Sequence, residues 1–137
     1  MSSYPLERLR PFAYVGAEQA AEYRAVMQVF MVAKRRFSLH LRPAEVQEGL
    51  PQVASHLDLA DELLEQRLAQ LCEWGNLEAH PDTAAVATVE DFYRRRLLFR
   101  VTPAGEAAER ALEVFYEVLE QPGELKAAAL SDIRNLL

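Results

Sequence analysis

The sequence predicts a mainly α fold with a small β-wing (α+β): a winged helix-turn-helix followed by C-terminal helices. Three segments before residue 75 place apolar residues at three- and four-residue steps, which is typical of helices with one buried face. The spacing then changes to the two-residue alternation of strands and returns to helical spacing after Pro103. This order suits the fold because three helices can bury a shared core while a hairpin closes its open side. Other α+β arrangements stay open at this point.

The chain is divided into an N-terminal arm (1–16), a winged-helix domain (17–102) and a helical extension (103–137). The last helical pattern runs to the final residue without a cap, so we expect a longer natural chain. With 137 residues, 50% of them hydrophobic and 26% charged, the composition is that of an ordinary globular protein. One core is therefore expected.

The sequence contains no membrane or export signal. No stretch approaches the ~18 apolar residues of a membrane span, and the segment 1–5 lacks a charged-then-apolar pattern. The single cysteine, Cys72, cannot form an internal disulfide and is expected to be a buried, inert thiol. We therefore expect a cytoplasmic protein with no membrane partner.

The N-terminal arm, which contains Pro5 and Pro11, is interpreted as irregular. A helix is predicted over 17–37, and it is apolar on more than one face. A surplus of apolar surface on a small domain usually marks an interface, so we predict a homodimer. The residues predicted at this interface are Phe12, Tyr14, Val29, Met31 and Val32. The alternative is that the arm folds back over the helix within one chain.

Two shorter elements and a third helix follow. Residues 39–41 alternate as a short strand would, and a short helix is predicted from Pro43 through Leu50, ended in part by Pro51. The run 58–74 carries leucines and a tryptophan on one helical face. Trp74 is expected to anchor the core, and Gly75 lies where a helix C-cap would be.

The wing is predicted from three apolar runs separated by polar ones. Strands are expected at 77–80 and 97–101, and the residues between them, which include the apolar run 85–89 and a possible helical turn at 90–95, are interpreted as an enlarged wing tip. Thr102 is a suitable N-cap and Pro103 a suitable first residue for a fourth amphipathic helix. The wing therefore leads directly into the helical extension.

Two strings in this region are more specific than the fold. Residues 73–83 are EWGNLEAHPDT and residues 86–96 are VATVEDFYRRR, and the match continues at VTPAGE over 101–106. In these strings the chain resembles the start of the JetA family of Wadjet plasmid-defence systems. The resemblance implies a kleisin subunit related to the MukF type, which bridges an SMC-like ATPase. It also implies an N-terminal winged-helix domain that can dimerise, with the SMC-like ATPase and other subunits as partners.

The charge pattern opposes DNA reading by the third helix. The whole sequence carries 15 basic and 21 acidic residues, a formal net charge of −6. Residues 58–74 contain one basic residue, Arg67, against five acidic ones, a balance of 1 − 5 = −4. This helix would be the recognition helix of a DNA-binding winged helix, and an acidic helix repels phosphate. Any DNA contact is therefore expected to be weak or indirect.

Basic residues cluster in two other places. Lys34, Arg35 and Arg36 are interpreted as a cationic last turn stabilised by the helix dipole. The second cluster lies at the predicted wing and could contact DNA phosphates or the carboxylates of a partner, the alternative being solvated side chains. Its members are Arg94, Arg95, Arg96 and Arg100.

No catalytic or cofactor motif is visible. His40, His56 and His80 belong to separate predicted elements, no CxxC or HExxH spacing occurs, and the isolated glycines form no phosphate loop. We therefore predict no enzyme activity, no metal and no cofactor. The leading hypothesis is a non-catalytic protein-interaction and dimerisation domain of a kleisin-like subunit in an SMC-type (Wadjet) anti-plasmid complex. The alternative is a winged-helix DNA-binding transcriptional regulator.

Overall fold

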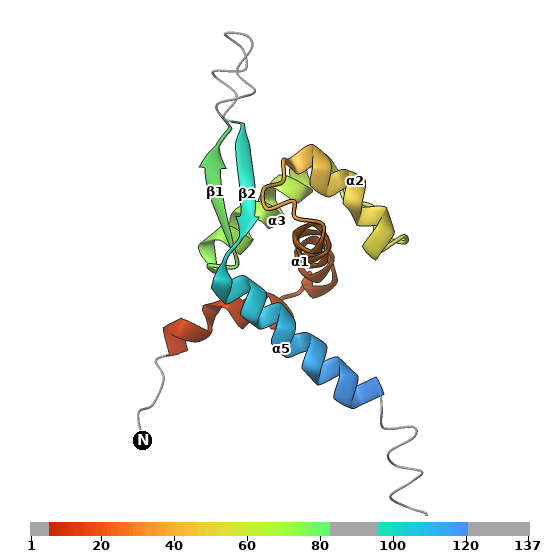
Figure 1. The fold of residues 1–137 in the computed structure, drawn as a ribbon, viewed down its shortest axis with the longest axis vertical. Coiled ribbons are helices and arrows are strands. Elements are labelled where there is room, and N and C mark those ends of the chain that lie inside the picture. The colour runs from red at the N-terminus through yellow and green to blue at the C-terminus, as the bar shows by residue number, and fades with distance from the viewer. Residues whose placement is uncertain (1–5, 83–95, 121–137) are drawn as a thin grey trace, which may run out of the picture.

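A computed structural model describes residues 6–82 and 96–120 of the chain (Figure 1). These residues form helices and one two-stranded antiparallel sheet, as predicted for a mainly α winged helix. The elements in chain order are η1 (Leu6–Gly16), α1 (Ala20–Arg35), α2 (Pro43–Val53), α3 (Asp61–Glu73), β1 (Leu77–Pro81), β2 (Leu97–Val101) and α5 (Pro103–Glu120).

Helix α1 lies in the middle of the fold. Figure 1 shows it nearly end-on, with α2 and α3 on one side and η1 and α5 on the other, and it contacts all four. Val26 and Met27 are fully buried in it, and Phe30 is almost so. A helix covered on two sides needs apolar residues on both, which explains why the apolar surface of α1 extends beyond one face.

The described part of the arm, residues 6–16, is not irregular, as the sequence had suggested, but forms the 3-10 helix η1 against α1 and α5. Tyr14 is fully buried, and its hydroxyl donates a hydrogen bond to Glu109 Oε1 of α5 at 2.8 Å. Regular backbone pairing suits this segment because it must lie on apolar surface without leaving its own amides unsatisfied. The alternative of an arm that folds back over its own chain is thus what the structure shows.

The predicted strand at 39–41 is reduced to one bridge, in which Leu41 and Phe99 exchange backbone hydrogen bonds of 2.9 and 2.8 Å. The helix α2 passes Pro51 and ends at Val53, one turn later than predicted. A proline this close to a helix end removes a single backbone bond, and burial of Leu50 holds the last turn in place.

Helix α3 ends as the sequence predicted. Gly75 has a φ of +84°, a left-handed conformation that favours glycine, and its amide donates to the Cys72 carbonyl at 3.1 Å. Trp74 at the C-cap is partly buried, and its ring meets that of Tyr23 edge-on at 5.0 Å between centroids. It packs against the core without being enclosed by it.

Strands β1 and β2 form the base of the wing. They pair antiparallel from Leu77 with Val101 to Pro81 with Leu97, and the inward face carries the buried ring of Phe99. The predicted wing tip, with the apolar run 85–89, and the arginines 94 and 95 lie outside the described residues.

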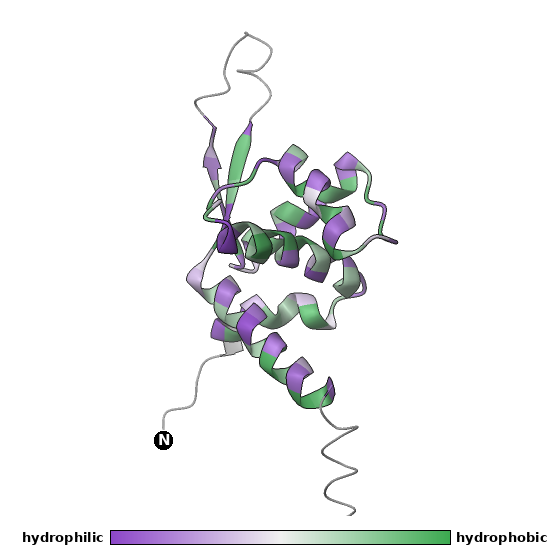
Figure 2. Cartoon of the chain, turned by 45° about the vertical axis from the view of Figure 1, so that its right-hand side comes forward, coloured by the Kyte–Doolittle hydropathy of each residue, from purple (hydrophilic) through white to green (hydrophobic). Residues whose placement is uncertain are grey.

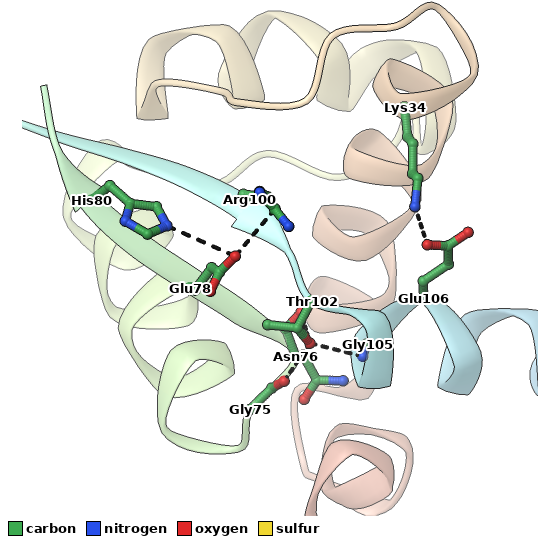
Figure 3. Close-up of polar contacts among 9 residues, drawn as sticks. All are labelled: Lys34, Gly75, Asn76, Glu78, His80, Arg100, Thr102, Gly105 and Glu106. Atoms are coloured by element: carbon green, nitrogen blue, oxygen red, sulfur yellow. Dashed lines mark hydrogen bonds and ion pairs between the residues drawn. The ribbon is translucent and has the colours of Figure 1, made fainter.

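The joint between β2 and α5 is held against the turn after α3 (Figure 3). Thr102 caps α5: its hydroxyl accepts a hydrogen bond from the Gly105 amide at 2.9 Å and donates one to the Gly75 carbonyl at 2.6 Å. A Cβ on Gly105 would lie 2.9 Å from the carbonyl carbon of Asn76 and closer still to its oxygen, so this position needs glycine. The direction of α5 is therefore fixed by the base of the wing.

Candidate interaction surfaces

The charged side chains that α3 exposes are all acidic. Asp61, Glu62, Glu65 and Glu73 are exposed, whereas Arg67 keeps only 14% of its side chain exposed. Its Nε donates a 2.6 Å hydrogen bond to Glu22 Oε2 of α1. This bond raises the pKa of Arg67 above its ordinary value, so the guanidinium stays charged. The only cation of the helix is thereby turned toward the protein.

A groove of about 750 Å³ lies between α3, the start of α2 and the base of the wing. At one end Arg42 Nε donates to Asp82 Oδ2 at 2.6 Å, and this bond raises the pKa of Arg42. The Asp82 side chain is only 2% exposed, whereas that of Arg42 is 48% exposed. The lining residues are Arg42, Pro43, Ala44, Glu65, Ala69, Cys72, Ala79, Asp82, Arg96, Leu97 and Phe99.

Cys72 forms part of the wall of this groove rather than of the closed core. It is partly buried, and burial raises the pKa of its thiol, which therefore stays protonated and apolar in character. The raised pKa of Cys72 is consistent with the predicted inert thiol. The prediction that Cys72 is buried was wrong, because the side chain is only partly buried. The difference arises because α3 turns this face toward the gap between α3 and the hairpin.

The arginines predicted at the wing do not form one cluster in the described part of the chain. Arg96 lines the groove, whereas Arg100 lies further down β2, where its Nε approaches Glu78 Oε1 at 3.1 Å (Figure 3). His80 Nε2 lies 3.7 Å from the same carboxylate oxygen. Arg100 is therefore engaged within the hairpin.

Most of the residues predicted at the dimer interface are covered within the chain itself. Tyr14, Val29 and Met31 are buried in the chain's own core, with exposed fractions of 0, 5 and 8%. Val32 is partly buried, and only Phe12 is clearly exposed, at 41%. Val29 is covered by α2, since a Cβ on Gly49 would lie 2.8 Å from Val29 Cγ1, and Tyr14 is covered where it bonds to Glu109 of α5.

A group of exposed apolar side chains lies instead on the second half of α5. Leu112 is the last buried residue of this helix, and beyond it the helix continues away from the core (Figures 1 and 2). Its large apolar residues there are exposed by 40 to 61%: Val114, Phe115, Tyr116, Val118 and Leu119. We call Val114, Phe115, Val118 and Leu119 the α5 strip. The spacing of the sequence revealed an apolar face here but not where the core ends.

The basic turn at the end of α1 is met by acidic residues of α5. Lys34 forms an ion pair with Glu106, and Arg35 Nη2 lies 3.1 Å from Glu113 Oε1. Lys34 lowers the pKa of Glu106, as expected for a carboxylate beside a cation. These two cations therefore link helices rather than forming a free basic patch.

Within the described residues, no group of three or more His, Cys, Asp or Glu side chains is placed to hold a metal ion. No helix in that part of the chain is long and apolar enough to cross a membrane. The two histidines His40 and His80, predicted on separate elements, do meet, with ring centroids 6.1 Å apart.

The helices, the capped joint and the two-stranded wing define a winged-helix protein. Residues 12–137 match a family model, and the chain belongs to the family described as "Protein of unknown function (DUF2397)". No curated protein matches the chain.

Two solved structures are similar in fold. One is a mutant of MarR from E. coli, with a TM-score of 0.50, 20% sequence identity, and coverage of 100% of this chain and 96% of that one. The other is wild-type MarR in its apo form from E. coli, with a TM-score of 0.49, 19% identity and the same coverage. At this identity the first likeness supports the winged-helix fold and nothing finer.

Proposed function

We propose that this chain is a non-catalytic protein-interaction and dimerisation domain, the N-terminal part of a kleisin-like subunit in an SMC-type (Wadjet) anti-plasmid complex. The observation that carries the proposal is the outer face of α3, where the carboxylates are exposed and Arg67 is turned inward to Glu22. A surface of this charge favours protein partners over nucleic acid.

The complex itself is proposed from the sequence strings at 73–83 and 86–96, which resemble the JetA family. Kleisins of this type use an N-terminal winged helix to dimerise and to approach their ATPase. The chain offers two surfaces suited to such contacts, the α5 strip and the groove beside α3.

The dimer is proposed through the α5 strip together with Phe12, rather than through α1. The four residues of the strip are 50 to 61% exposed, and η1, which carries Phe12, packs against α5. Exposed apolar side chains gathered on one helix usually mark an interface, and a two-fold contact is the simplest way for identical chains to bury them.

The test of the complex is co-expression of the chain with an SMC-like ATPase encoded beside it. We expect the two to co-purify through size exclusion, with Phe115→Glu or Glu65→Lys variants identifying the surface used. The absence of any neighbouring SMC-like gene, or failure of the two proteins to associate while both are folded, would refute the complex.

A DNA-binding transcriptional regulator is the second candidate, and the fold likeness to MarR favours it. That function requires a recognition helix able to approach phosphates and base edges in a major groove. Here α3 carries exposed acids, so DNA contact would have to come from other elements. Direct measurement of DNA affinity separates the two candidates.

A further inference from the structure

We propose that the groove between α3 and the base of the wing binds a basic amphipathic helical segment of a protein partner. The inference rests on the proposed interaction function and adds to it the chemical class of partner that this surface fits. It is carried by the groove's apolar walls and by the charges along the helix beside it.

The groove has the size and lining of a binding site. Its volume of about 750 Å³ lies within the ~300–1,000 Å³ range of ligand pockets, enough for several large apolar side chains. Ala69 of α3 and Pro43 and Ala44 of α2 supply small apolar walls, and Leu97 and Phe99 of β2 complete them. Small side chains on α3 leave the space that a partner's larger ones would occupy.

The charge beside the groove is arranged along α3. Glu62, Glu65 and Ala69 follow at three- and four-residue steps, which places them in one row on the helix surface. Glu62 and Glu65 are exposed, so the row leads from carboxylates at the start of α3 into the apolar groove.

Arginines also lie near the groove, and Arg96 forms part of its lining. Arg42 is bonded to Asp82 at 2.6 Å, and Arg67 is bonded to Glu22 at the same distance. The exposed charge of α3 is therefore negative, which selects a partner that carries lysines or arginines next to its apolar residues.

A helical segment can supply both the apolar side chains that the groove accepts and the cations that the carboxylates of α3 attract. An amphipathic helix presents apolar anchors at steps of three, four and seven residues and carries charged residues along the edges of that face. Laid along α3, it would place its anchors in the groove and its cations over Glu62 and Glu65. Duplex DNA offers a continuous row of phosphates to the same carboxylates and is disfavoured there.

The test uses the full 137-residue chain and fluorescein-labelled model peptides followed by anisotropy. One peptide of about 18 residues arranges leucine and lysine as an amphipathic helix. A second has glutamate in place of lysine, and a third contains the same leucines and lysines in scrambled order. A labelled duplex DNA serves as a fourth ligand.

Two variants probe the groove and each has a matched control. Ala69→Trp fills the groove from an exposed position, and Ala107→Trp adds the same side chain at an exposed position of α5. Glu62→Lys with Glu65→Lys reverses the charge of the row, and Glu117→Lys with Glu120→Lys makes the same change on exposed α5 residues. Circular dichroism confirms that each variant is folded.

We expect the leucine–lysine helix to bind with a Kd of about 10–100 µM and at least about tenfold more tightly than the other two peptides. Ala69→Trp and the α3 double reversal should each weaken binding about tenfold, while both α5 controls leave it within about twofold. Equal binding of the scrambled or acidic peptide, equal effects of the α5 controls, or no binding at all would overturn the proposal.

The outcomes also separate this inference from the proposed function. If the peptide fails to bind and the duplex DNA also fails, the groove is not the site, and protein interaction through the α5 strip stands. If duplex DNA binds and Ala69→Trp weakens it, both the groove proposal and the interaction function fall.

Discussion

Arg67 of α3 donates from Nε to Glu22 Oε2 of α1 at 2.6 Å, and its guanidinium carbon lies 5.4 Å from the centre of the Tyr23 ring. In a winged helix that reads DNA, a cation at this helix would face the phosphates. Here the same residue fastens α3 to α1. The ion pair thus stabilises the packing of α3 against α1. The charged side chains that remain exposed on α3 are acidic.

Loss of this ion pair should weaken the fold measurably. Both partners are largely shielded, with 14% of the Arg67 side chain and 25% of the Glu22 side chain exposed. We expect Arg67→Met to lower the free energy of unfolding by about 1–3 kcal/mol, because it leaves a partly buried carboxylate unpaired. Urea denaturation followed by circular dichroism measures this change.

The matched control is Arg110→Met, which breaks a pair with Glu106 while Arg110 is 70% exposed. Exposed pairs contribute little, so its effect should stay below about 0.5 kcal/mol. If the two variants were equally stable, the view of Arg67 as a structural link would be wrong.

Gly105 is expected to tolerate no side chain. A Cβ there would overlap the backbone carbonyl of Asn76, which belongs to the turn that joins α3 to β1 and cannot move independently. We expect Gly105→Ala to destabilise the chain by about 1–3 kcal/mol or more in thermal or urea denaturation. Gly16→Ala is the control, because nothing lies within 4 Å of its added Cβ. A stable Gly105→Ala variant would mean that α5 leaves the wing in another direction.

The buried carboxyl of Glu109 should make stability depend on pH. Its side chain is 2% exposed, and desolvation by burial raises its pKa above the ordinary value of 4.5, although the hydrogen bond from Tyr14 and the charge of Arg24 oppose this. A raised pKa in the folded state gives stability that is present below the unfolded pKa and is lost as pH rises through the folded value.

The variant Glu109→Gln removes this titration while keeping an acceptor for the Tyr14 hydroxyl. We therefore expect the Tm of Glu109→Gln minus that of the wild type to increase between about pH 4 and pH 8. Glu106, whose pKa is lowered, makes stability change with pH in the opposite direction. Because both proteins contain Glu106, its contribution cancels in the difference between their Tm values. A Tm difference that stayed constant or decreased with pH would contradict the buried state of this carboxyl.

The proposed dimer should depend on α5 and not on α1. Phe115→Glu or Val118→Glu places a carboxylate among side chains that are 57 and 61% exposed in one chain. Such a charge is harmless in water but costly in a dry interface, so light scattering behind size exclusion should show a folded monomer where the wild type is a dimer.

Val29→Glu serves as the contrasting variant. Val29 is 5% exposed and lies against Gly49 in the core, so an unpaired carboxylate there should unfold the chain rather than divide a dimer. A wild-type chain that is monomeric at tens of micromolar would remove the dimer from the account.

Local signals in the sequence predicted most elements of the fold. The glycine after α3 and the Thr102–Pro103 pair before α5 gave helix ends that the structure confirms, because capping depends on neighbouring residues alone. The strand predicted at 39–41 failed because pairing requires a partner, and only Leu41 meets one, at Phe99.

The surfaces were harder to predict because burial is decided by distant contacts. Val29 and Phe115 look alike in spacing and hydrophobicity, yet the first is 5% and the second 57% exposed. The inward turn of Arg67 was equally invisible, since Glu22 lies 45 residues earlier in the chain. The acidic character of α3, by contrast, follows from its composition, and the structure places these acids on the exposed side of the helix.

DNA affinity tests the central claim most directly. The full chain is titrated into labelled duplexes of random and of selected sequence at about 150 mM salt, and anisotropy gives the Kd. With acids on the outer face of α3 and Arg67 bonded to Glu22, we predict a Kd weaker than about 10 µM and no preference between sequences. Nanomolar, sequence-selective binding at that salt would contradict the account and identify the chain as a DNA-binding regulator.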